Sequence, residues 1–225
     1  MKPMIAIVAG GDSSEHDVSL RSAEGLMSFM DKEKYRCYVV ELTAAHWTVD
    51  YEGETCPVNH EDFSFQASDG HHVFDFAYIT IHGTPGENGI LQGYFDLIGL
   101  PYSTSDVLVE SLTFNKYALN NFLRAFPEVH VSDSVLVRKG EDRPTDEEIA
   151  TRLGLPCFVK PNAGGSSFGV TKVKEVEGLT PAIEKAMMQS DEVLAATFTA
   201  CSGSPSACPK RPAGTRPPLS IPRHR

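Results

Sequence analysis

The sequence lacks any apolar segment long enough to cross a membrane. None of its apolar runs approaches the about 20 residues that a transmembrane helix requires. Its first four residues, MKPM, lead directly into a strand-like segment and lack the pattern of a signal peptide. We therefore expect a cytoplasmic protein that makes no contact with a membrane.

Paired cysteines and an excess of basic residues are also missing. The five cysteines are odd in number and have no metal-ligand spacing, which disfavours a disulfide framework and a zinc site. The 30 acidic residues outnumber the 20 basic ones, whereas nucleic-acid binding depends on clustered Lys and Arg. The sequence therefore predicts small-molecule partners and no nucleic-acid binding.

Acidic residues are absent between Ala200 and Arg225, where five basic residues and six of the 15 prolines occur. Such a composition cannot bury enough apolar surface to offset the entropy of ordering. We predict that residues 199–225 form a disordered, basic, Pro-rich tail. The abrupt change of composition inside an apparent strand is typical of a reading-frame change, and an arm that binds a partner is the alternative.

Alternating strand and helix patterns fill the rest of the chain. They favour an α/β fold with a parallel sheet covered by helices, followed by a second α/β unit that is cut off. Residues 47–69 are polar and irregular, as in short hairpins or a surface excursion. The expected strands are residues 4–9, 37–42, 74–81, 131–137, 157–160, 170–173 and 193–198, and the expected helices are residues 18–30, 89–98, 113–125, 145–153 and 179–189.

The strongest local signal is a loop of small residues between two short strands, residues 161–169 (PNAGGSSFG). Glycine N–H groups and the hydroxyls of Ser166 and Ser167 can approach phosphate oxygens closely. Lys160, held extended by the proline that follows it, adds a fixed positive charge. The loop does not have the spacing of a Walker P-loop. It predicts a cradle for a triphosphate, with a ligand-free β-hairpin turn as the alternative.

Glu15 lies in residues 10–19 (GGDSSEHDVS), where the first expected strand passes into its helix. Ligands of open α/β sheets bind at the carboxyl ends of the strands, so this carboxylate could accept the ammonium of an amino acid. The alternative is that Asp12 to Asp17 only cap the helix. The spacing G-x-G-x-x-G of a dinucleotide site is missing here.

His82 begins a second glycine segment, residues 82–93, which follows a strand and opens a helix. The turn could bind an anionic or carbonyl oxygen, and His82 would face the same crevice as Glu15. A hydrogen-bonded scaffold histidine is the alternative. Glu87 fits a turn or capping residue. Lys116 opens a later helix, where a solvated charge is the alternative to a role in binding.

Taken in this order, the segments resemble the D-alanine:D-alanine ligase family of the ATP-grasp superfamily. The resemblance covers roughly residues 4–198. It rests on GGDSSE at residues 10–15, VSL at residues 18–20, HGTPGE at residues 82–87, LQG at residues 91–93 and GLPY at residues 99–102.

The resemblance implies an N-terminal parallel-sheet, Rossmann-like (pre-ATP-grasp) domain at residues 1–103. An incomplete ATP-grasp α+β domain would follow at residues 104–198. The resemblance also implies roles for six residues: catalysis by Glu15 and Ser166, substrate binding by Glu15 and His82, and ATP binding by Lys116, Lys160, Ser166 and Ser167.

The activity implied by the resemblance is the ATP-dependent joining of two D-alanines through an acyl phosphate, for peptidoglycan precursors. D-alanine and ATP would be the partners, and a homodimer is a further expectation. The family's ligands for Mg²⁺ or Mn²⁺ would lie beyond this chain's end, and Ala196 stands about where the family has an acidic residue. We therefore expect no metal site and no complete turnover by this chain alone. A noncatalytic module that binds a nucleotide or an amino acid is the alternative, and a nucleotide-cofactor oxidoreductase is a third, weaker interpretation.

Overall fold

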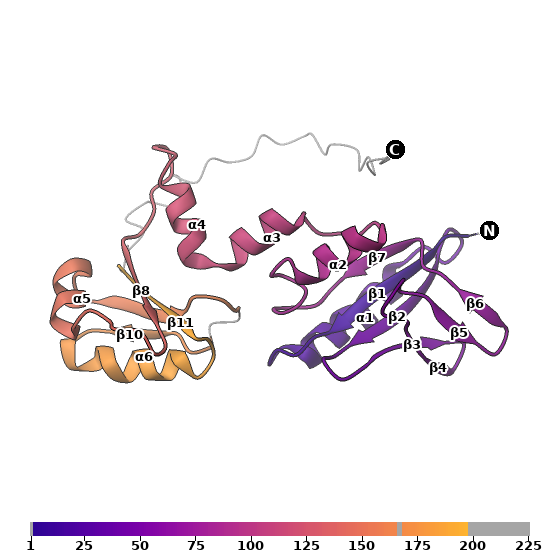
Figure 1. Ribbon diagram of the computed structural model, residues 1–225, viewed down its shortest axis with the longest axis horizontal. Coiled ribbons are helices and arrows are strands. Elements are labelled where there is room, and N and C mark those ends of the chain that lie inside the picture. The colour runs from indigo at the N-terminus through magenta and orange to yellow at the C-terminus, as the bar shows by residue number, and fades with distance from the viewer. Residues whose placement is uncertain (1, 166–167, 198–225) are drawn as a thin grey trace.

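The computed structural model describes residues 2–165 and 168–197, which form two separate main sheets. In Figure 1 the two sheets lie side by side along the long axis of the molecule, and helices α3 (Val107–Phe114) and α4 (Lys116–Leu123) connect them. We call residues 4–98, which hold strands β1 to β7 and helices α1 and α2, the N-terminal unit. The described residues of 134–197, which hold strands β8 to β11 and helices α5 and α6, are the C-terminal unit. The predicted disorder of residues 199–225 lies outside the described residues.

The main sheet of the N-terminal unit has the order β4-β3-β2-β1-β7. Its central strand β1 (Met4–Gly10) pairs in parallel with β2 (Arg36–Leu42) and with β7 (Phe76–Ile79). This pairing confirms the predicted α/β fold with parallel strands. The hairpin of β3 (Trp47–Tyr51) and β4 (Glu54–Pro57) extends the sheet in antiparallel fashion. Of the two alternatives expected for residues 47–69, short hairpins or a surface excursion, this is the first.

Helices cover both faces of this sheet because side chains of a strand point alternately to opposite sides. On one face, Ile7 and Ala9 of β1 pack against helix α1 (His16–Phe29) through Ala23. On the other face, alternate residues of β1 join the larger core, which includes Phe95 of helix α2 (Ile90–Ile98). The loops at the carboxyl end of β1 are therefore held by two packed helices.

An aromatic cluster holds the irregular region against this second face. Phe63 packs its ring against Trp47 at 5.8 Å, Phe74 at 5.6 Å and Phe95 at 5.0 Å between ring centroids. Each such pair adds about 0.5–1.5 kcal/mol beyond the burial of its area. A short hairpin of β5 (Phe65–Ala67) and β6 (Gly70–His72) completes the cover.

Two helices, and not the one expected at residues 113–125, connect the units. Helix α3 (Val107–Phe114) ends and helix α4 (Lys116–Leu123) begins at Asn115, whose backbone is extended with φ −88° and ψ 101°. The side chain of Asn115 accepts a hydrogen bond from the N–H of Ala118, as an N-cap does. The single-helix prediction was wrong because this capping asparagine starts a new helix.

The C-terminal unit is a four-stranded sheet in the order β10-β9-β11-β8, with every neighbouring pair antiparallel. Its core unites the apolar faces of two helices with one face of this sheet. A capping box formed by Thr145 and Glu148 begins the first of these helices. The elements are β8 (Ser134–Arg138), α5 (Asp146–Leu153), β9 (Cys157–Pro161), β10 (Thr171–Val173), a 3₁₀ turn (Val176–Gly178), α6 (Leu179–Met187) and β11 (Glu192–Thr197).

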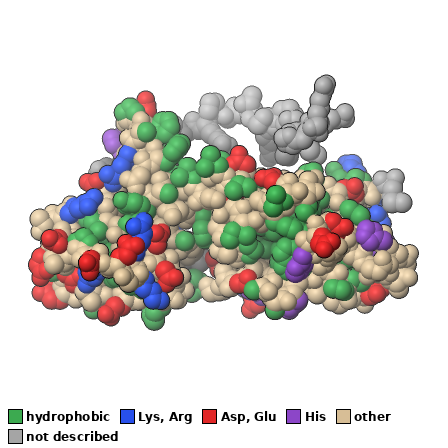
Figure 2. All heavy atoms as spheres, viewed as in Figure 1, with side chains coloured by type: hydrophobic (Ala, Val, Ile, Leu, Met, Phe, Trp, Pro, Cys, Tyr) green, Lys and Arg blue, Asp and Glu red, His purple; other side chains and the backbone are tan. Residues whose placement is uncertain are grey.

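Charged side chains of both signs are interspersed over the outside of the C-terminal unit (Figure 2). Among them, Arg143 pairs with Asp146 at 2.7 Å and Lys139 pairs with Asp191 at 3.3 Å. In the part of the chain that the structure describes, no helix is long and apolar enough to span a membrane. The predicted boundary between residues 103 and 104 stays a prediction.

Candidate functional site

A cavity of about 660 Å³ lies where the loops of the two units face each other. Both units contribute to its walls, so the cavity depends on how the units are joined. Its lining residues are Asp12, Ser13, Ser14, Glu15, Gly83, Thr84, Phe114, Lys116, Pro161, Ala163, Gly164, Gly165, Phe168, Val170, Met188, Gln189 and Ser190.

Glu15 reaches this cavity from the loop between β1 and α1. Its backbone N–H donates to Ser13 Oγ at 3.2 Å, and the same hydroxyl donates to the carbonyl of His82 at 2.8 Å. Ser13 thereby ties the loop that carries Glu15 to the second glycine segment. The side chain of Glu15 does not cap α1, and Asp12 accepts from the N–H of Ala44 at 2.8 Å instead of capping that helix. The alternative that these residues only cap the helix therefore does not hold for the side chains of Glu15 and Asp12.

His82 is placed differently from Glu15. Its neighbours Gly83 and Thr84 line the cavity, whereas His82 does not, and its carbonyl is the acceptor for Ser13. Glu87 closes the turn by accepting from the N–H of Gly83 at 2.7 Å, as expected of a turn residue. The role of His82 in substrate binding stays a prediction. The structure does not place His82 on the cavity wall to which Glu15 contributes.

Lys116 enters the same cavity from the start of α4. Its Nζ donates to the carbonyl of Gly164 at 2.7 Å and to that of Asn162 at 3.4 Å. The pKa of Lys116 is lowered, first by burial and then by the charge of Lys160, while Glu87 acts in the opposite direction. Lys116 is thus a half-buried cation and not the solvated charge of the alternative interpretation.

Lys160 lies on β9 and shares this electrostatic environment. Burial lowers its pKa also. Two ammonium groups that are partly removed from water and repel each other would both be stabilised by an anion placed between them. Lys160 itself is not among the residues that line the cavity, so its contact with a ligand stays a prediction.

The glycine loop brings the two halves of the site close together. A Cβ placed on Gly165 would lie 3.2 Å from Oε2 of Glu15, which is tighter than ordinary van der Waals contact. Because Gly165 has no side chain, the loop can approach the carboxylate of Glu15 this closely. Ser166 and Ser167, which the sequence predicts as ATP contacts, lie outside the described residues.

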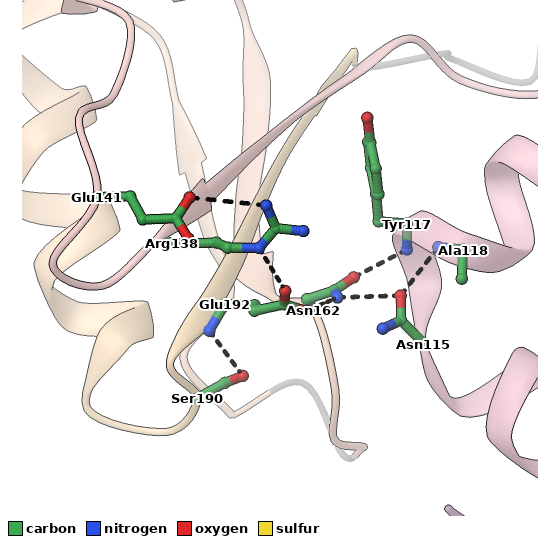
Figure 3. Close-up of polar contacts among 8 residues, drawn as sticks. All are labelled: Asn115, Tyr117, Ala118, Arg138, Glu141, Asn162, Ser190 and Glu192. Carbon is green, nitrogen blue, oxygen red and sulfur yellow. Dashed lines mark hydrogen bonds and ion pairs between the residues drawn. The ribbon is translucent and has the colours of Figure 1, made fainter.

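Sequence reasoning missed Asn162, which is fully buried and joins the glycine loop to α4 (Figure 3). It stands in a run of small and polar residues, where no periodicity marks one of them as buried. Its partners Asn115 and Glu192 are 47 and 30 residues away, so no local pattern could have predicted them.

The expected absence of a metal site in this chain stays a prediction. Across residues 2–165 and 168–197, no group of three or more His, Cys, Asp or Glu side chains is placed to hold one. We therefore assign no metal-dependent step to these residues.

Replacing Lys116 with methionine is expected to stabilise the chain by about 0.5–1 kcal/mol, a typical gain when a functional compromise is removed. Folding lowers the pKa of Lys116 below its ordinary value of 10.5, so the ionised amine opposes folding at neutral pH. This penalty fades as the pH rises through the lowered pKa toward 10.5. Thermal unfolding at pH 7 and at pH 10 should show a gain for Lys116→Met that is smaller at the higher pH.

Lys185→Met is the matched control, because Lys185 is exposed in the last turn of α6. Its loss should leave the stability unchanged or slightly lower it, since a cation there favours the helix dipole. A destabilising effect of Lys116→Met at pH 7 would contradict the expected sign.

Two family models match the sequence. The model for the D-ala D-ala ligase N-terminus matches residues 4–105, and the model for the D-ala D-ala ligase C-terminus matches residues 127–204. The chain is 59% identical over 199 residues to a D-alanine--D-alanine ligase of Phocaeicola vulgatus. That match covers 88% of this chain and 61% of the relative. The chain therefore spans less than two thirds of the length of this relative.

Solved structures show the same fold. The D-Ala:D-Ser ligase VanG of Enterococcus faecalis superimposes with a TM-score of 0.76 at 30% identity, over 89% of this chain and 64% of that chain. The D-alanine--D-alanine ligase of Bacillus anthracis complexed with ATP gives a TM-score of 0.66 at 28% identity, over 88% of this chain and 59% of that chain.

Proposed function

Because the chain belongs to the D-alanine--D-alanine ligase family, we propose that it acts in the ATP-dependent joining of two D-alanines. The observation that carries this proposal is that one cavity is lined both by Glu15 of the N-terminal unit and by Lys116 of the connecting helix α4. A carboxylate suits an amino-acid ammonium, and a half-buried lysine suits a phosphate. A ligase that uses ATP requires both ligands in one enclosed space.

We assign the following chemistry to the proposed reaction. A carboxylate oxygen of the first D-alanine attacks the γ-phosphorus of ATP, and the bond from that phosphorus to ADP breaks. The amine of the second D-alanine then attacks the acyl carbon of the resulting acyl phosphate. Phosphate leaves, the amine loses a proton, and an amide bond has formed. Positioning and neutralisation of charge supply most of the catalysis in such phosphoryl transfers.

The residues of this chain would contribute in two places. Glu15 would hold the ammonium of the first D-alanine and so direct its carboxylate toward the nucleotide. Lys116 and Lys160 would offset the negative charge of the phosphates, with Ser166 and Ser167 on the covering loop. When bound, Mg²⁺ or Mn²⁺ would supply further charge neutralisation in the family's reaction.

The product would serve peptidoglycan precursor synthesis in the cytoplasm, where ATP is at hand. Dimerisation stays a prediction. The noncatalytic binding module remains the competing function, and ligand binding by single variants separates the two.

Glu15→Gln is expected to lower the affinity for D-alanine at least about tenfold, because a hydrogen bond to a charged group is worth about 1.5–3 kcal/mol. Its affinity for ATP should stay unchanged. Lys116→Met is expected to lower the affinity for ATP and to leave the affinity for D-alanine unchanged. Isothermal titration of the 225-residue chain with each ligand measures both affinities.

Two matched controls carry the same substitutions on exposed helix positions. Glu24→Gln on α1 and Lys185→Met on α6 should bind both ligands like the unaltered chain. If the unaltered chain binds neither D-alanine nor ATP, the proposed function is wrong for this chain. Binding of ATP alone, with no effect of Glu15→Gln on any amino acid, would favour the noncatalytic nucleotide module.

A further inference from the structure

Asn162 follows β9, has 0% of its surface exposed, and has every one of its polar atoms hydrogen-bonded. Figure 3 shows the contacts of its side chain. Its side-chain Nδ2 donates to Asn115 Oδ1 at 3.0 Å and to Glu192 Oε2 at 2.7 Å. Its Oδ1 accepts from the N–H of Tyr117 at 2.8 Å. Its backbone N–H donates to the Glu192 carbonyl at 2.9 Å, and its carbonyl accepts from the N–H of Lys116 at 3.1 Å.

These bonds complete the amino end of helix α4. The first four N–H groups of a helix have no partner within the helix and need a cap. In α4 these are the N–H groups of Asn115, Lys116, Tyr117 and Ala118. Asn115 Oδ1 accepts from Ala118 as a local N-cap, and the N–H of Asn115 donates to the carbonyl of Ser111. Asn162 accepts from Lys116 and Tyr117, although it lies in the C-terminal unit. Half of the cap of α4 therefore comes from the residue that follows β9, the strand that carries Lys160.

This arrangement fixes Lys116, the first residue of α4, by its backbone as well as by its side chain. Its N–H and its Nζ both donate to the carbonyl of Asn162, and its Nζ also reaches Gly164. Because all four N–H groups of the first turn are bonded within the protein, they are not open to a phosphate. Recognition of an anion at this helix end must therefore use the Lys116 side chain.

Glu192 determines which way the Asn162 amide points. Its carboxylate accepts from Arg138 Nε at 2.8 Å and from Asn162 Nδ2 at 2.7 Å. The hydrogen bond from Arg138 is the largest cause of the lowered pKa of Glu192, so this carboxylate stays ionised at neutral pH. A fixed acceptor for Nδ2 leaves Oδ1 directed at α4.

We propose that Asn162 is a positioning residue for the nucleotide, which caps α4 from the C-terminal unit and so holds Lys116 in place over the glycine loop. The proposal rests on the proposed function for the identity of the anion. The placement of Lys116 itself does not depend on any ligand. Asn162 is not among the residues that line the cavity, and it acts through Lys116, which is.

A double-mutant cycle tests whether Asn162 acts through Lys116. Asn162→Ala keeps the backbone carbonyl that accepts from Lys116 but removes the side-chain bonds that fix the start of α4 against it. It should therefore weaken the binding of a nonhydrolysable ATP analogue about tenfold. In a Lys116→Met background the same change should weaken binding by less than about twofold, because coupled residues are not additive. Asn121→Ala is the matched control, because Asn121 is exposed on α4, where its side chain donates to the Tyr117 carbonyl. Equal losses in both backgrounds would overturn the proposal.

A second measurement needs no nucleotide. Titration of ¹³C-methylated lysines by NMR, with the Lys116 signal identified by its loss in Lys116→Met, reports the pKa of that amine. Lys160 on β9 lowers this pKa and Glu87 in the second glycine segment raises it, besides the effect of burial. In Asn162→Ala the Lys116 pKa should rise toward its ordinary value, since the amine gains water. An unchanged titration would overturn the proposal even if the unaltered chain bound no ATP, which is how the two failures are told apart.

An exchange of donor and acceptor guards against a variant that merely fails to fold. Asn162→Asp keeps an acceptor for Tyr117 but sets a second carboxylate against Glu192, and it should weaken nucleotide binding at least about tenfold. Adding Glu192→Gln supplies a donor in the reverse direction and should restore most of that affinity. If the double variant binds no better than Asn162→Asp, the network does not position the lysine.

Discussion

Replacing Phe95 with alanine is expected to lower the free energy of unfolding by about 3–5 kcal/mol, the usual range for a buried phenylalanine. Phe95 on α2 has 0% of its surface exposed. Its ring packs against Phe63 at 5.0 Å, Tyr94 at 5.4 Å and Tyr102 at 6.1 Å between centroids. Truncation would remove one partner from the aromatic cluster and leave a cavity beneath the sheet. Urea unfolding followed by fluorescence of Trp47, the chain's single tryptophan, reports on this same cluster.

The matched control lies on the same helix. Leu97 is 88% exposed, so Leu97→Ala should change the stability by less than about 0.5 kcal/mol. The comparison holds helix propensity nearly constant and varies the burial. Comparable losses in the two variants would mean that α2 does not anchor the N-terminal unit through Phe95.

Elements whose burial leaves a regular pattern could be predicted from the sequence. The apolar run of β1 and the helical periodicity of α1 predicted both elements to within a few residues. The same holds for α2, which begins at Ile90, inside the second glycine segment. In each case the local spacing of apolar residues predicts the same element that burial in the fold stabilises.

Elements that depend on distant contacts could be predicted only in part, and for residues 47–69 the sequence left short hairpins and a surface excursion as alternatives. The hairpin of β3 and β4 has polar, irregular spacing, and it is held by Trp47 and Phe63 against α2, which lies further along the chain. The break between α3 and α4 depends on Asn115, whose side chain is held by Asn162, the residue that follows β9. Neither contact leaves a periodic trace in the sequence.

The candidate site shows the same division. Glu15 and Lys116 could be singled out because each stands where a loop meets a helix, and both line one cavity. Asn162 could not, because its role arises from partners that only the fold brings together. His82 was expected beside Glu15, and the turn instead presents its neighbours Gly83 and Thr84. Spacing predicts which loops meet, whereas the direction of each side chain depends on the local hydrogen bonds.

The loop that carries Glu15 depends on Gly10, and Gly10→Ala is expected to destabilise the chain by about 3 kcal/mol, the sum of backbone strain and overpacking. Gly10 has a φ of +96°, which side chains rarely adopt. A Cβ there would lie 2.6 Å from the carbonyl oxygen of Leu42. That oxygen already accepts from the N–H of Gly11 at 2.7 Å, so it is held at the end of β2 and cannot move aside.

Two other glycines separate the contributions to this loss. Gly53 has a φ of +85° with no atom within 4 Å of a Cβ, so Gly53→Ala should cost about 1 kcal/mol, from strain alone. Gly25 lies in the interior of α1 with open space around it, so Gly25→Ala should stabilise the chain by about 0.5–1 kcal/mol. Urea unfolding of the three variants should therefore give one gain, one small loss and one large loss. Equal losses for Gly10→Ala and Gly53→Ala would show that the Leu42 carbonyl yields, and that β2 does not fix the loop that carries Glu15.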